Sequence, residues 1–187
     1  MKKIVFAMAA VAAFAASADL KIAVVNMPDL VKFHPQHESN KTLVKSTSKD
    51  NRAKLDKQQE ALKAIMDDVK KAQEEYRNPM LSVQRKAEIQ KKLEALEQKF
   101  MAGRQEMEAS VRHYQEELSD LESRLLRMET DDLRKKIEDY AKKNGYDLVL
   151  EKPLVGFARD SLDVTDDILK VLGVDPAKRR EKGDEGK

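Results

Sequence analysis

Residue types that could bind metal are present in this 187-residue chain, but their spacing does not assemble a metal site. His34, His37 and Glu38 lie together, yet their order differs from the HExxH zinc motif and no third ligand is placed beside them. A proline at this point breaks the helical pattern. We therefore interpret the two histidines as solvated or helix-capping groups, and His113 as a solvated group on the flank of a long helix.

Nucleophilic and acid–base chemistry also lack a setting in this sequence. Paired carboxylates belong to charged helix faces with Lys or Arg three or four residues away: Glu74-Glu75, Glu116-Glu117 and Asp131-Asp132. A catalytic carboxylate needs a cleft that shifts its pKa, which a slender helical hairpin does not offer. No Ser stands in a GxSxG turn, no GxxxxGK[ST] phosphate loop is present, and Cys is absent. We predict a protein that is not an enzyme and uses no metal or cofactor.

Residues 1–18 have the organisation of a secretory signal peptide. Lys2 and Lys3 form a basic start, residues 4–14 an apolar run, and Ala16-Ser17-Ala18 a small-residue cleavage site. The apolar run is too short to span a bilayer, although an uncleaved anchor is the alternative interpretation. We expect cleavage after Ala18 and export to the periplasm.

The charge of the exported chain argues against nucleic acid as a partner. Removing Lys2 and Lys3 from the 36 basic residues leaves 34, which equals the 34 acidic residues. A neutral protein outside the cytoplasm has neither the charge nor the location for nucleic-acid binding. Without Cys no disulfide can stabilise it, so it must depend on packing or assembly.

Residues 36–143 have the pattern of a long antiparallel coiled-coil hairpin. The apolar residues at seven-residue spacing are Leu55, Leu62, Val69 and Tyr76 on the way out, and Leu93, Phe100, Met107, Tyr114, Leu121 and Met128 on the return. Sustained heptads of this kind predict a coiled coil. Asn78-Pro79 predicts that the chain reverses within residues 77–81, because a proline inside a helix costs about 3 kcal/mol. A single kinked helix is the alternative interpretation. In the hairpin, about forty residues at ~1.5 Å each form an arm roughly 60 Å long.

Short β-type segments flank this arm at residues 19–35 and 144–173. We predict strands at Leu20–Met27, Tyr146–Glu151 and Leu154–Arg159, which are rich in β-branched and apolar residues. Gly145 should end the long helix, and Asp163 should cap a short helix that ends near Leu172.

These strands predict assembly between copies of the chain. Three short strands are too few to bury apolar side chains on both faces. The fold class predicted is therefore mainly helical α+β, a hairpin arm on a small β-rich body completed by other protomers. The residues expected at that contact are Ile22, Val24, Val25, Leu148, Val149, Val155 and Phe157. Residues 174–187 are nearly all charge and Gly, which predicts a disordered tail.

Two sets of arm residues are candidates for contact with a partner. The basic set on the outgoing helix is Lys41, Lys45, Lys49 and Arg52. It is either a solvated face or an attractive surface for acidic proteins or anionic lipid. The flexible apolar set near the turn is Met80, Leu81 and Met101, which either closes the end of the hairpin or binds apolar segments of a partner.

An ordered set of three segments resembles the Skp (OmpH) family of periplasmic chaperones. They are Lys21–Met27, Gly145–Leu150 and Asp163–Lys170, and the resemblance extends over the chain to about Leu172. It implies a homotrimer whose arms surround a cavity, and an ATP-independent holdase for unfolded outer-membrane β-barrel proteins. The best-known members are strongly basic whereas this exported chain is neutral, which weakens the expectation of lipopolysaccharide or anionic-lipid binding. A structural or tethering coiled coil of the cell envelope, without client binding, is the alternative function.

Overall fold

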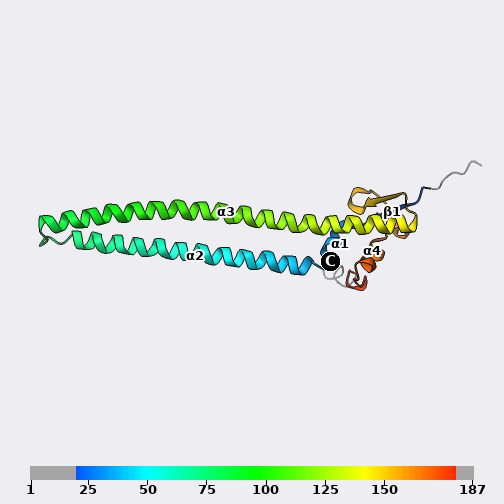
Figure 1. Cartoon of the computed structure of the whole chain (residues 1–187), viewed down its shortest axis with the longest axis horizontal. Helices are drawn as coiled ribbons and strands as arrows, with labels where there is room; N and C mark the ends of the chain where they lie inside the picture. Colours follow the sequence, from blue (N-terminus) through cyan, green and yellow to red (C-terminus); the bar gives the residue numbers. More distant parts are fainter. Residues whose placement is uncertain (1–19, 180–187) are drawn as a thin grey trace, which may run out of the picture.

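The computed structural model describes residues 20–179 as a long helical hairpin joined to a small body (Figure 1). The elements in chain order are β1 (Ile22–Val25), α1 (Met27–Lys32), α2 (His37–Tyr76), α3 (Val83–Asn144), β2 (Leu148–Glu151), short 3-10 turns at Lys152–Leu154 and Asp160–Leu162, and α4 (Thr165–Val171). This confirms the predicted class, mainly helical α+β with an antiparallel hairpin arm. The expected signal peptide at 1–18 lies outside the described residues.

The connection between α2 and α3 is held by side chains on both sides of Pro79. The Asn78 side-chain oxygen accepts a hydrogen bond from the Met80 N–H (3.0 Å), and the Ser82 hydroxyl caps α3 by accepting from the Arg85 N–H (3.2 Å). The Arg85 guanidinium then donates to Glu75 of α2 (2.7 Å). These bonds replace the helical bonds that a proline cannot make.

The heptad residues of the arm lie along the contact between α2 and α3, with two exceptions. We call the line of contact between α2 and α3 the seam. Tyr76 and Met128 are exposed, so the prediction that they belong to the seam is wrong. Glu129, the residue after Met128, is buried instead. A strict seven-residue repeat drifts relative to a 3.6-residue helix, so an inward position passes to a neighbouring residue toward the end of a run.

The sheet of the body has two parallel strands rather than three. β1 pairs with β2 from Ile22↔Leu148 to Val25↔Glu151, and the other edge of β1 receives only a bridge at Asp163. The predicted strand at Leu154–Arg159 is wrong. The chain turns into a 3-10 helix that begins beside Pro153, which has no N–H to donate to a strand ladder.

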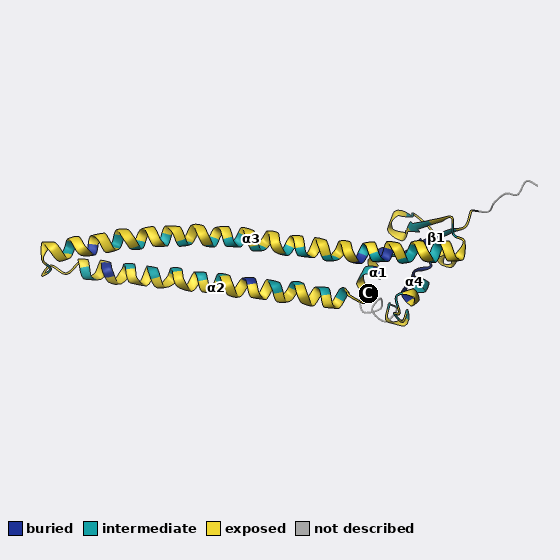
Figure 2. Cartoon of the chain, viewed as in Figure 1, coloured by how far each residue is buried: buried dark blue, intermediate teal, exposed yellow. Residues whose placement is uncertain are grey.

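Helices complete the core of the body within a single chain. Its buried members are Ala23, Val25, Met27, Leu30, Leu133, Val164, Ile168 and Leu169. They come from β1, α1, the last part of α3, and α4 with the residue before it, and Figure 2 shows dark buried positions at this end of the molecule as well as a few along the arm. Val24 and Val25 are therefore enclosed by their own chain and have no surface to offer another protomer.

The chain direction changes at Gly145, which ends α3 in the left-handed conformation (φ 68°). The Tyr146 N–H then donates to the Ala141 carbonyl (2.9 Å), as expected for a helix that ends with glycine. This reversal starts β2 beside β1.

Residues 174–179 are ordered, so the prediction of disorder is wrong for this part of the tail. Val174 packs against the core. Arg179 forms ion pairs with Asp29 of α1 (2.7 Å) and Asp166 of α4 (2.8 Å). The carboxylates around the Arg179 guanidinium hold this segment against the body. The rest of the predicted tail, residues 180–187, lies outside the residues that the structure describes.

Within residues 20–179, no helix combines the length and apolar character that crossing a bilayer requires.

Candidate functional site

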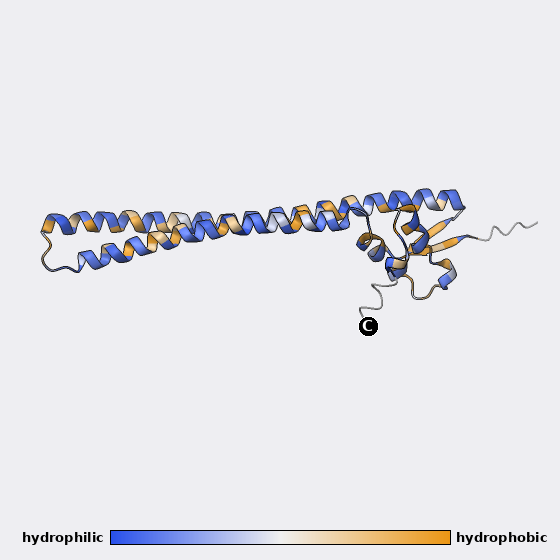
Figure 3. Cartoon of the chain, turned by 90° about the horizontal axis from the view of Figure 1, so that it is seen from below, coloured by the Kyte–Doolittle hydropathy of each residue, from blue (hydrophilic) through white to orange (hydrophobic). Residues whose placement is uncertain are grey.

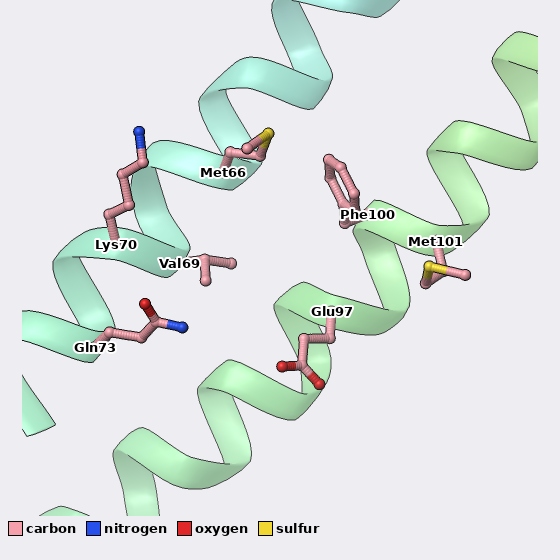
Figure 4. Close-up of a pocket in the computed structure, with 7 residues that line it drawn as sticks. All are labelled: Met66, Val69, Lys70, Gln73, Glu97, Phe100 and Met101. Atoms are coloured by element: carbon pink, nitrogen blue, oxygen red, sulfur yellow. The ribbon is translucent and has the colours of Figure 1, made fainter.

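An apolar groove opens between α2 and α3 in the outer half of the arm and encloses about 470 Å³ (Figure 4). Its lining residues are Met66, Val69, Lys70, Gln73, Glu97, Phe100 and Met101. In Figure 4, Val69 of α2 and Phe100 of α3 extend into the space between the two helices. The groove thus combines an apolar floor from the seam with more exposed side chains at its margins.

The groove lies next to a point where the two helices approach closely. A Cβ atom at Gly103 would be 2.9 Å from the Leu62 Cδ2, closer than side-chain atoms pack. Glycine therefore lets Leu62 press against α3 at this level. About one turn further toward the tip, Met66 and Phe100 line the groove.

The chemistry of the groove suits apolar side chains of varied shape. Met66 and Met101 are 47% and 54% exposed, and methionine adapts to different partners because its unbranched thioether chain repacks easily. Lys70 and Glu97 contribute one charge of each sign, so the groove has no strong preference for a charged ligand. Figure 3 shows apolar and hydrophilic residues alternating along the rest of the arm.

The predicted apolar contact residues are not gathered in one place. Met101 lines the groove, whereas Met80 is exposed and Leu81 half-buried at the tip of the hairpin. Met66, Val69 and Phe100 were not predicted as contact residues, because the apolar repeat assigns all three to the contact between the two helices. Met66 lies four residues after Leu62 and three before Val69, so the local pattern gave no signal that it borders a groove.

The predicted basic contact residues lie on a different part of the arm. Lys41 and Lys45 line a second groove of about 440 Å³ near the body, together with Leu125 and Leu126. Lys49 and Arg52 are exposed further along α2. The structure thus separates the basic set from the apolar groove.

Residues predicted for assembly fall into buried and exposed groups. Ile22 and Val149 are half-buried in the sheet, and Val155 is half-buried in the segment after it. Leu148 and Phe157 are exposed. Leu154, which the prediction did not include, is exposed as well.

Both histidines at the base of the arm contact carboxylates, and the interpretation as a solvated group is wrong for His34, which is buried, whereas His37 is partly exposed. His34 is buried with its Nε2 atom 3.2 Å from Asp132, and the His37 Nδ1 atom lies 3.1 Å from Glu129. His34 also accepts a hydrogen bond from the Gln36 N–H beside the start of α2, which agrees with the capping interpretation. The carboxylates lie more than ninety residues away in sequence, so local pattern could not reveal the pairs. Over residues 20–179, no cluster of three or more His, Asp or Glu is arranged to hold a metal ion.

Two ionisable groups of the body are perturbed by their surroundings. Burial, with nearby Asp167 and Tyr146, raises the pKa of Tyr140 to about 12, so its hydroxyl remains a donor to Asp167 (3.3 Å). Burial of the Asp163 carboxyl opposes ionisation, but hydrogen bonds from Lys152 (2.7 Å) and Thr165 outweigh it and lower the pKa of Asp163. Both groups stabilise the packing of α4 and contact no groove of the arm.

Comparison with known proteins identifies the family. The fold is similar to the crystal structure of a candidate outer membrane chaperone (OmpH-like) from Caulobacter crescentus CB15, with a TM-score of 0.57 and 14% sequence identity over 82% of this chain and 83% of that one. Among curated proteins, no sequence matches. The family model for OmpH-like outer membrane proteins matches residues 21–172, which include both strands, the whole arm and α4. The chain therefore belongs to the OmpH-like outer membrane protein family.

Proposed function

We propose that this protein is an ATP-independent periplasmic chaperone that holds unfolded outer-membrane β-barrel proteins against its arms. The observation that carries the proposal is the apolar groove on an otherwise charged arm, bordered by the half-exposed Met66 and Met101. In a segment that will form a barrel strand, every second side chain faces the same side. An unfolded segment of this kind therefore offers apolar side chains that suit such a groove. Each contact contributes on the order of 1 kcal/mol, so many together retain a client that can still leave without ATP.

The holding function is proposed to require a homotrimer whose arms surround the client. Leu154 and Phe157 are 80% and 82% exposed on the body, which is an unfavourable position for large apolar side chains in water. Within the described chain β2 pairs only with β1, so its outer edge presents unpaired backbone groups to another strand. A second copy that covers this edge and these side chains would satisfy both requirements.

Suppression of aggregation tests the holdase proposal. Denatured β-barrel protein is diluted into buffer with the purified exported chain at near-stoichiometric trimer, without ATP, and light scattering is followed. We expect suppression by the unaltered protein and a clear loss in the double variant M66S/M101S. Met128→Ser is the matched control, because Met128 is 58% exposed and lies outside both grooves.

Several outcomes would contradict this proposal. If the unaltered protein leaves scattering unchanged but binds one folded envelope protein at fixed stoichiometry, the chain is a tethering coiled coil. Strong salt-dependent binding to anionic vesicles, without effect on scattering, would instead indicate a lipid-binding role. Equal loss of suppression in M66S/M101S and Met128→Ser would remove the groove from the mechanism.

Assembly and export have separate tests. Sedimentation equilibrium should give a trimer for the unaltered protein and smaller species for L154S/F157S, and a monomer at micromolar concentration would overturn the trimer. N-terminal sequencing of protein recovered from the periplasm should begin at Asp19 if the leader is cleaved after Ala18.

A further inference from the structure

Two grooves lie along the seam, one toward the tip of the arm and one toward the body. The outer groove is the apolar groove of about 470 Å³ that Val69 and Phe100 line. The inner groove is the second groove, of about 440 Å³, and the half-buried Val44 and Leu125 lie on its floor. Leu126, which is 52% exposed, lies at its margin. Each groove therefore offers a place for an apolar side chain of a partner.

Both grooves open on the same side of the hairpin. Their margins are formed by residues that directly follow a seam residue in the sequence. These are Lys41, Lys45 and Leu126 in the inner groove, and Lys70, Glu97 and Met101 in the outer groove. Successive helical residues turn by about 100° in a constant sense. Because α2 and α3 run antiparallel, the residues that follow the seam on both helices lie on one side of it, which we call the groove side.

The distance between the two grooves matches the length of a barrel strand. Val44 and Val69 are 25 residues apart on α2, as are Phe100 and Leu125 on α3. At ~1.5 Å per residue this separation is about 38 Å, which an extended chain covers with about eleven or twelve residues at ~3.3 Å each. Strands of membrane barrels have about 9–11 residues in the bilayer and carry aromatic residues where they meet its two surfaces. One such strand is long enough to place an aromatic side chain in each groove.

The surface between the grooves is more basic on the groove side than on the opposite side. The charged residues that follow the seam in this interval are Arg52, Lys63, Arg104 and Arg112 against Asp56 and Glu108. Those that precede the seam, on the opposite side, are Lys54 and Lys57 against Asp50, Glu106, Glu117 and Asp120. Formal charge is thus +2 on the groove side and −2 on the other. The groove side therefore attracts a segment whose polar residues are acidic.

We propose that the two grooves and the basic surface between them form one track for a single strand of an unfolded β-barrel protein. The aromatic ends of the strand occupy the two grooves, and its acidic polar side faces the basic surface. This inference rests on the proposed holding function and adds which part of a client one arm binds. A segment that reaches both grooves is held more tightly than one that reaches a single groove, because its second contact is intramolecular.

The spacing is tested with two labelled peptides of identical composition, built from Phe, Thr, Ser and Asp. In the first, two Phe pairs are eleven residues apart, and in the second they are six residues apart with the remaining residues placed outside them. Fluorescence anisotropy at low salt measures the affinity of each for the unaltered exported chain. We expect the Kd of the first peptide to be at least about tenfold lower.

The peptide result and the aggregation assay separate the track from the holding function. Suppressed aggregation together with equal affinities for the two peptides would overturn the track and leave the holding function standing. A tenfold preference without suppression would support the track as a peptide site and remove the holding function. Because this comparison uses only the unaltered protein, it remains decisive if a variant fails to fold.

Variants of either groove should abolish the preference for the longer spacing. In Leu126→Ser, which alters the inner groove, and in M66S/M101S, which alters the outer groove, both peptides should bind with the affinity of the shorter one. Met128→Ser is exposed outside both grooves and should keep the tenfold preference. A preference that survives in both groove variants would overturn the track. So would a fall in oligomer mass in Leu126→Ser with no peptide bound, since the inner groove would then be an interface between copies.

Charge reversal tests which side of the arm the strand occupies. Lys63 lies on the groove side and Lys57 on the opposite side, and both are exposed on α2. Lys63→Glu should weaken binding of the eleven-residue-spaced peptide several-fold, whereas the matched control Lys57→Glu should leave it unchanged. Equal weakening by the two variants would overturn the placement of the strand on the groove side.

Discussion

The body and the arm of this protein differ in how completely they bury their apolar side chains. The body encloses side chains such as Leu30, Leu133 and Ile168 completely, with helices on several sides of a small sheet. Between residues 37 and 128 the arm buries only Asn51, Ala72 and Ile89 to a similar degree. Two helices side by side leave half of each surface in water, so the arm gains little from burial per residue. We therefore expect the body to be rigid and the arm to be more flexible.

The arm itself differs between its outer and inner halves. Toward the tip the seam is apolar, with Val69, Ala72 and Ile89. Toward the body it contains polar bridges from Asn51 to Glu117 (3.0 Å) and from Gln58 to Ser110 (3.1 Å), and the Gln58 side-chain oxygen has no partner among the described residues. Polar seam residues specify the register of two helices at a cost in stability. The inner half should therefore open first.

The largest predicted effect comes from the core of the body. Leu133→Ala removes a fully buried side chain and should lower the free energy of unfolding by about 2–5 kcal/mol. Leu62→Ala, in the half-buried seam of the arm, should cost less than half as much because water already reaches that site. Urea denaturation at one fixed protein concentration measures both. Equal losses would remove the distinction between body and arm.

A smaller loss is predicted at the start of α4. The N-terminal cap of α4 is Val164, so the prediction that Asp163 caps this helix is wrong, but the Asp163 carboxylate still accepts from the Thr165 N–H (3.0 Å). Asp163→Ala should cost about 1 kcal/mol at pH 7, the usual net contribution of a hydrogen bond. Asp160→Ala, at an exposed aspartate nearby, should cost much less.

The loss at Asp163 should depend on pH. Because the pKa of Asp163 is lowered in the folded state, its contribution is present above the ordinary aspartate value of about 3.9 and disappears as pH falls below it. Thermal unfolding of Asp163→Ala and the unaltered protein between pH 3 and pH 7 measures this. A difference that does not shrink in acid would show that the carboxylate charge is irrelevant.

Within the arm, an apolar substitution should strengthen the inner half. Asn51→Leu replaces a buried amide by a seam-filling side chain and should stabilise the arm by about 0.5–1 kcal/mol. Hydrogen exchange of α2 amides around residue 51 should slow accordingly. Asn51→Ala controls for helix propensity, since it improves propensity without filling the seam. Faster exchange in Asn51→Leu would indicate that the Glu117 bond contributes more than packing does.

The smallest effect is predicted at the tip. Arg85 bonds to Glu75 and Glu88 in full contact with water, and hydrogen bonds to both carboxylates raise the pKa of its guanidinium. Arg85→Ala should leave the urea midpoint of unfolding almost unchanged, because solvent screens exposed ion pairs. The effect should vanish in 1 M salt. A loss as large as that of Asp163→Ala would show that the turn, and not the body, limits stability.

Local signals predicted the arm well and the body poorly. Heptads and Asn78-Pro79 act over a few residues, so a coiled coil and a reversal could be predicted without knowing the rest of the fold. The strand expected at Leu154–Arg159 failed because Pro153 turns the chain before the segment can pair. The order of residues 174–179 was missed because it depends on Arg179 reaching Asp29, 150 residues away in sequence.

By itself, the sequence determined the mainly helical class, the length of the arm and the end of α3 at Gly145, because periodicity and backbone preference are local properties. Only the tertiary structure decided which side chains meet across the hairpin. It placed Met66 beside Phe100 in a groove and brought His37 to the buried Glu129. The physical reason is that pairing depends on the register and spacing of two long helices, which no short stretch of either helix specifies.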